Sequence, residues 1–149
     1  MKLKDMAVVS SAGVIKYEDL KVDKFDKEVV LLTGANISEL GCLSLIADKQ
    51  ESNLRKVFVE EELFQSKKLD AGDIVFMSRG SSLRAVIVRE EDLQFDLLPS
   101  PNFLIIKAKS GLVLPEIIVA FLNSVLGQQV LDRLTTGAAL KNVPVGKLK

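Results

Sequence analysis

Apolar residues change their spacing along this chain, and the changes predict the order of its elements. Residues 3–9 place Leu3, Met6 and Ala7 at helical spacing, so we expect a short helix that stops at the Ser/Gly-containing segment 10–13. Apolar runs bounded by turn residues then predict short strands at 29–33, 43–47, 57–59, 74–77, 85–88, 95–98 and 103–106.

The last third of the chain has a helical pattern. Pro115 suits a first helical turn, and Ile117, Phe121 and Val125 recur every four residues along an apolar stripe. We expect Gly127 to interrupt this helix and a second helical stretch to follow it. The predicted fold class is α+β: a single domain over residues 1–149, with a short N-terminal helix, mostly antiparallel short strands and C-terminal helices.

One hairpin is predicted in more detail than the rest. Residues 70–73 have turn chemistry, in which Gly72 is free to take a positive φ. They lead into the strand at 74–77, and the strand at 85–88 returns beside it. The segment between these strands is then a polar loop at the tip of a hairpin.

Charge and composition narrow the function classes. Twenty basic and twenty acidic residues cancel, which argues against an indiscriminate polyanion binder. Residues 97–149 nevertheless hold six bases and two acids, which indicates either a phosphate-facing surface or a solvated basic end. Cys42 is the only cysteine, and neither a signal peptide nor a membrane span is evident, so we expect a cytoplasmic protein.

Catalytic residue types are scarce. The chain has no histidine, which removes the commonest general base and metal ligand, and we expect Cys42 to be a buried structural thiol. No glycine-rich phosphate loop is present, and the acidic runs 60–62 and 90–92 are expected at solvated loops or helix ends. We therefore predict no enzyme activity, no metal and no cofactor; the disfavoured alternative is a small hydrolase or nuclease that uses Asp and Glu with a divalent metal.

The loop between the hairpin strands carries the most informative chemistry. Residues 78–84 hold two arginines, three serines and a glycine, and Arg can bind guanine or phosphate while Ser can hydrogen-bond to either. The alternative is a plain hairpin tip with exposed arginines. The residues that we expect to contact DNA are Ser78, Arg79, Ser81, Ser82 and Arg84, with Asn102, Lys107 and Lys141 as weaker candidates.

An ordered set of segments resembles a known family. Each resembles, in order, a segment of the target-recognition domain in the specificity subunit of type I restriction–modification systems. The segments are 3–13 (LKDMAVVSSAG), 69–81 (LDAGDIVFMSRGS), 101–106 (PNFLII), 114–124 (LPEIIVAFLNS), 127–129 (GQQ) and 136–142 (TGAALKN).

This resemblance implies a DNA-binding role without catalysis. In that family each recognition domain reads one half of a split site on double-stranded DNA. Methyl transfer and cleavage belong to the partner DNA methyltransferase (modification) subunit and restriction subunit. The chain departs from the pattern because it carries one recognition domain and ends at residues 146–149, where a spacer helix is expected. A second copy, or another half of a specificity subunit, is then a further expected partner.

One alternative keeps the fold and changes the function. The neutral total charge would also suit a non-catalytic protein-interaction module of the same fold that does not bind DNA.

Overall fold

The structure is a computed structural model that describes residues 3–11, 27–38, 42–46, 48, 50, 52–77, 79–80, 83–100, 103–134 and 141–142. Its helices are α1 (Leu3–Met6), α2 (Glu61–Lys67), α3 (Pro115–Asn123) and α4 (Val125–Leu134), with 3-10 turns η2 (Gly34–Asn36) and η3 (Glu90–Gln94). Its strands are β1 (Ala7–Ser11), β2 (Lys27–Leu32), β3 (Arg55–Val59), β4 (Ile74–Met77), β5 (Arg79–Gly80), β6 (Ala85–Ile87), β7 (Leu97–Pro99), β8 (Phe103–Ala108) and β9 (Lys141–Asn142). The predicted α+β class, with mostly antiparallel strands, a short N-terminal helix and C-terminal helices, is confirmed.

The central sheet has the strand order β1-β8-β4-β6, and all its pairs are antiparallel. Its middle strands are buried on both faces, which explains their uninterrupted apolar sequences. Ile74 and Phe76 pack with the inner sides of α3 and α4, whereas Val75 between them points to the opposite core. The hairpin of β4 and β6 therefore stands on a rigid, fully covered base.

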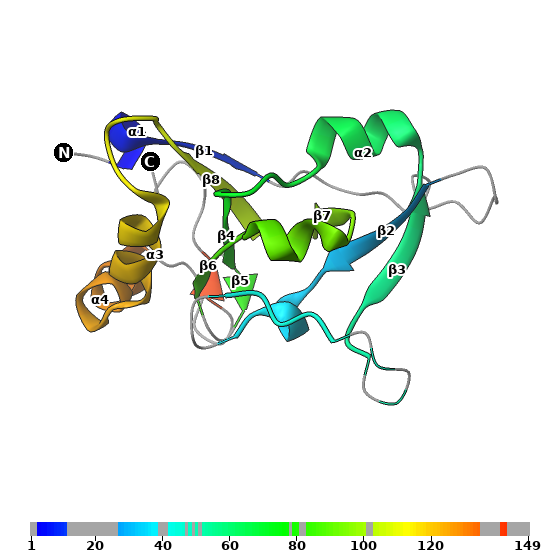
Figure 1. The fold of residues 1–149 in the computed structure, drawn as a ribbon. Coiled ribbons are helices and arrows are strands. Elements are labelled where there is room, and N and C mark those ends of the chain that lie inside the picture. Colours follow the sequence, from blue (N-terminus) through cyan, green and yellow to red (C-terminus); the bar gives the residue numbers. More distant parts are fainter. Residues whose placement is uncertain are drawn as a thin grey trace.

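A second sheet, β3-β2-β7, packs against the other face of the central one. Along β2, Val30 and Leu32 join the core between the sheets, while Val29 and Leu31 pack near Phe64 of α2. Strand β7 runs parallel to β2. Figure 1 shows the resulting arrangement: α3 and α4 lie at one end, followed by the central sheet, the second sheet and α2.

Two predicted element boundaries are wrong for the same physical reason. The expected helix at 3–9 ends at Met6, and Ala7–Ser11 form a strand along β8 instead. Glycine 127 does not interrupt a helix either; the break falls at Ser124, and Gly127 lies inside α4. In both places tertiary packing overrides the local pattern.

Gly127 packs tightly against the backbone at the end of α3. A Cβ built on it would lie 1.9 Å from the carbonyl oxygen of Phe121, so a larger residue does not fit. The glycine is a close-packing residue, although its sequence position suggests a helix breaker.

Smaller differences concern strand edges. In the described part of the segment expected as a strand at 43–47, Leu43 makes an isolated bridge to Ile37, and the preceding Cys42 makes one to Ile87. The strand expected at 95–98 occupies Leu97–Pro99, after the turn η3. Helix α2 was not predicted as an element. Gly72 takes the predicted positive φ, at 90°.

Within the described residues, no helix is both long enough and apolar enough to span a membrane.

Candidate nucleic-acid interface

The loop that carries the predicted DNA contacts is closed at its base by the hairpin. Strands β4 and β6 pair from Ile74↔Ile87 to Phe76↔Ala85. One step further, the Met77 N–H donates to the Arg84 carbonyl at 2.8 Å. Arg84 is half-buried at this closing position. The loop therefore leaves and re-enters the molecule at adjacent, hydrogen-bonded points.

Strand β5 brings two distant segments together. It pairs antiparallel with β9, with Arg79 opposite Asn142 and Gly80 opposite Lys141. The arginine-bearing loop and the basic last third, which were predicted separately, thus lie side by side through their backbones (Figure 1). Residues 78, 81, 82 and 102 lie outside the described residues, as do the side chains of Arg79 and Lys141.

Two amide side chains from the helices hold the returning end of this loop. Asn123, at the end of α3, accepts a hydrogen bond from the Ala85 N–H and donates one to the Ala85 carbonyl, both at 2.8 Å. The side chain of Gln128 donates to the carbonyls of Leu83 and Leu122, each at 2.7 Å. These contacts satisfy buried backbone groups and fasten the loop to the helical layer.

Sequence analysis did not single out these two amides. The available signal was an Asn and a Gln placed within an otherwise apolar helical segment, where a polar residue often has a specific backbone partner.

Lys107, a weaker candidate for DNA contact, has carboxylate partners in the structure. Its Nζ lies 3.0 and 2.9 Å from the two carboxylate oxygens of Asp73, and 3.6 Å from Asp70. Asp73 is buried, and it also accepts a hydrogen bond from the Asp70 N–H at 2.9 Å. The Lys107 ammonium therefore neutralises this buried carboxylate, and a DNA contact by Lys107 stays a prediction.

The same contacts change the protonation of Lys107. Partial desolvation lowers its pKa, but the hydrogen bonds and charges of Asp73 and Asp70 outweigh this and raise the pKa above its ordinary value of 10.5. The lysine is therefore firmly charged at neutral pH.

A shallow hollow of about 330 Å³ lies around this ion pair. Both charge types line it: the cations are Lys67, Lys68 and Lys107, and the anions are Asp70 and Asp73. Such a balanced lining does not select strongly for an anion.

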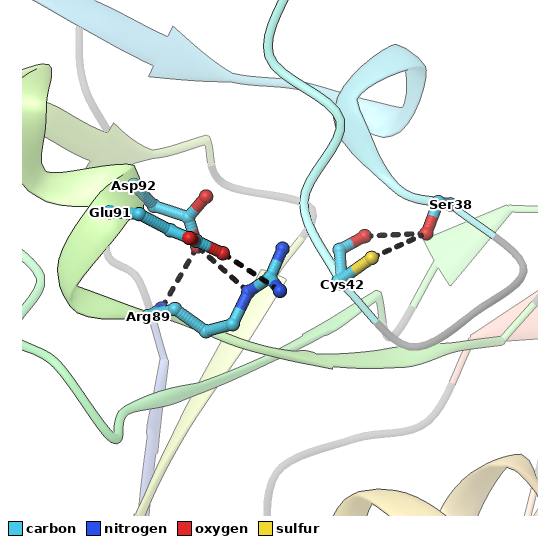
Figure 2. Close-up of polar contacts among 5 residues, drawn as sticks. All are labelled: Ser38, Cys42, Arg89, Glu91 and Asp92. Carbon is cyan, nitrogen blue, oxygen red and sulfur yellow. Dashed lines mark hydrogen bonds and ion pairs between the residues drawn. The ribbon is translucent and has the colours of Figure 1, made fainter.

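The acidic runs lie at helix starts, which agrees with the prediction, but Asp92 is buried where a solvated side chain was expected. Glu61 and Glu62 lie in the first turn of α2, where a negative charge suits the helix dipole. In η3, Asp92 is buried and accepts a hydrogen bond from the Arg89 N–H at 2.9 Å, as Figure 2 shows. The Arg89 guanidinium also lies 2.8 Å from the Glu91 carboxylate. These charges form a local cap.

Cys42 was predicted to be a buried structural thiol, and the burial part of this prediction is wrong. Cys42 is half-buried, and its Sγ lies 3.3 Å from the Ser38 hydroxyl oxygen, which also donates to the Cys42 carbonyl at 2.8 Å (Figure 2). Its segment bridges to Ile87 at the outer edge of β6. Cys42 therefore helps to close that edge of the central sheet.

The described part of the chain contains no group of three or more Cys, Asp or Glu side chains placed to hold a metal ion. No protein-family model matches the sequence, and no curated protein is significantly similar to it.

Proposed function

We propose that this chain is a DNA target-recognition domain of the kind found in type I restriction–modification specificity subunits. Its loop at 78–84 would bind one half of a split site on double-stranded DNA. The observation that carries the proposal is the pairing of β5 with β9, which sets Arg79 and Gly80 beside Lys141 and Asn142.

The chemistry of this pairing suits a DNA groove. An arginine can donate two parallel hydrogen bonds to guanine O6 and N7, and a neighbouring lysine can neutralise a phosphate. Base recognition requires the arginine to be held at a fixed position relative to the base edge, and rigid elements of the fold provide such a position. Strand β4, buried from Ile74 to Phe76, and the amides of Asn123 and Gln128 supply that support.

The proposal leaves all catalysis to other subunits. A DNA methyltransferase subunit and a restriction subunit would bind the complete specificity subunit and act on the DNA that it selects. Such a role belongs in the cytoplasm.

The test is selection of duplexes from a randomised library, with the full chain and its Arg79→Ala variant. The wild type should enrich a short motif, and Arg79→Ala should lose preference at one base pair, at a cost of about 1–3 kcal/mol. Arg55→Ala is the matched control, because Arg55 is an exposed arginine on β3, in the β3-β2-β7 sheet and not in the β5–β9 pair. An Arg79→Ala variant with an unchanged motif would refute the role of Arg79.

A second candidate is a protein-interaction module without DNA binding. It is favoured by the exposed apolar side chains on α3 and α4, among them Ile117 and Val125. Failure of the wild type to enrich any motif or to shift any duplex at low salt, together with self-association or partner binding, would support this candidate instead.

A further inference from the structure

Helices α3 and α4 carry a broad apolar face that the described residues leave uncovered. Its side chains are between 37% and 78% exposed. Leu112 and Leu114 lie just before α3, and the others are Ile117, Phe121, Val125, Leu126 and Val130 of the two helices; we call all seven the α3–α4 face.

The residues of this face are neighbours in space. Leu114, Ile117 and Phe121 follow each other at spacings of three and four along one side of α3. Leu126 and Val130 do the same on α4. The tight contact of Gly127 with the Phe121 backbone joins the two rows. The two helices that carry these rows are therefore packed directly against each other.

The opposite side of the same helices is buried in the core. Ile118, Val119 and Leu122 of α3, with Leu131 of α4, pack on the central sheet. Helix α3 is consequently apolar on two sides, and a helix with this pattern is normally covered on both. This pattern indicates that something packs on the outer side as well.

The size of the face matches one half of a stable dimer interface. With on the order of 100 Å² from each of these side chains, it presents roughly 700 Å² of apolar surface. A standard interface takes about 800 Å² from each partner, whereas the largest apolar patch on a typical monomer is about 300–600 Å².

We propose that a second copy of this chain covers the α3–α4 face, in a twofold homodimer. An apolar face is complementary to itself, as a twofold interface requires. The net charge of zero means that two copies meet without long-range repulsion. Around the face lie charges of both signs, Glu116 in the first turn of α3 and Arg133 in the last turn of α4.

The inference does not rest on the proposed DNA binding, and its test contains no DNA. Sedimentation velocity of the full chain, over increasing protein concentration, should show the dimer mass replacing the monomer mass. Ile117→Glu and Val125→Glu should each weaken the dimer at least about a hundredfold, because each places an unpaired charge in the apolar contact.

The matched control is Ile46→Glu. Ile46 is an isoleucine exposed to 41%, compared with 57% for Ile117, and it lies in a loop outside α3 and α4. This variant should dimerise like the wild type. Circular dichroism should show the same folded spectrum for all variants, since each replaces an exposed side chain.

The proposal is overturned by a wild type that stays monomeric, by a dimer that Ile117→Glu and Val125→Glu leave intact, or by equal weakening in Ile46→Glu.

Discussion

Lys107 was predicted to contact DNA, and in the structure its ammonium group pairs with the carboxylate of Asp73. The Asp73 carboxylate is buried beneath the turn that contains Gly72, and Lys107 from β8 reaches it with two short hydrogen bonds. Removal of the lysine would leave a buried negative charge with a single backbone donor, from Asp70. The pair therefore ties the β4 turn to β8.

Replacement of Lys107 by Met should lower the free energy of unfolding by about 1–2 kcal/mol at neutral pH, since Lys107 is half-exposed and the loss is partly screened. The structure raises the pKa of Lys107, so its contribution is fully present below the ordinary pKa of 10.5 and fades as pH rises through the folded-state value.

The measurement is denaturant unfolding of both proteins at several pH values. The stability difference between wild type and Lys107→Met should shrink on the alkaline side. Lys56→Met is the control, because Lys56 pairs with an exposed Glu28 and its loss should change little. A Lys107→Met variant as stable as Lys56→Met would contradict this account.

Among the elements, the end of α3 and the start of β6 are coupled by Asn123. Ala85 is fully buried, and both of its backbone groups use the Asn123 side chain as their partner. Asn123→Ala should therefore cost about 2 kcal/mol or more, because two buried polar groups lose their hydrogen bonds.

A local readout distinguishes this coupling from a general loss of stability. Hydrogen exchange at the amides of Ala85 and Met77 should accelerate more in Asn123→Ala than exchange at Val30 in the second sheet. Gln129→Ala, at an exposed position of α4, should leave all three amides unchanged. Uniform acceleration across both sheets would argue against a local tether.

The elements also show what sequence alone could predict. Strands β4, β6 and β8 and the start of α3 were found because apolar runs, turn residues and Pro115 agree locally. Strand β1 was missed because its residues keep helical spacing but pair with β8, and α2 because its few apolar residues form too short a stripe. Gly127 was misjudged because the Phe121 backbone that excludes a side chain is a feature of packing.

At the scale of the whole molecule, the prediction of the candidate site had the same limits. The arginine-bearing loop and Lys141 were predicted as DNA contacts separately, from their residue types. Only the fold shows that their backbones pair, through β5 and β9. Lys107 was predicted to contact DNA, and nothing in the neighbouring sequence indicates that it also pairs with the buried Asp73. Long-range partners of charged residues are not encoded in their neighbours along the chain.

The central claim, that DNA binds at the joined β5 and β9 segments, can be tested most directly by NMR. Backbone amide shifts of the full chain would be followed as a short mixed-sequence duplex is added at low salt, where weak binding is detectable. The account predicts that the shifts concentrate at Arg79, Gly80, Arg84, Lys141 and Asn142. Shifts confined to other surfaces, such as the hollow beside Lys67 and Lys68, or no shifts at all, would contradict it.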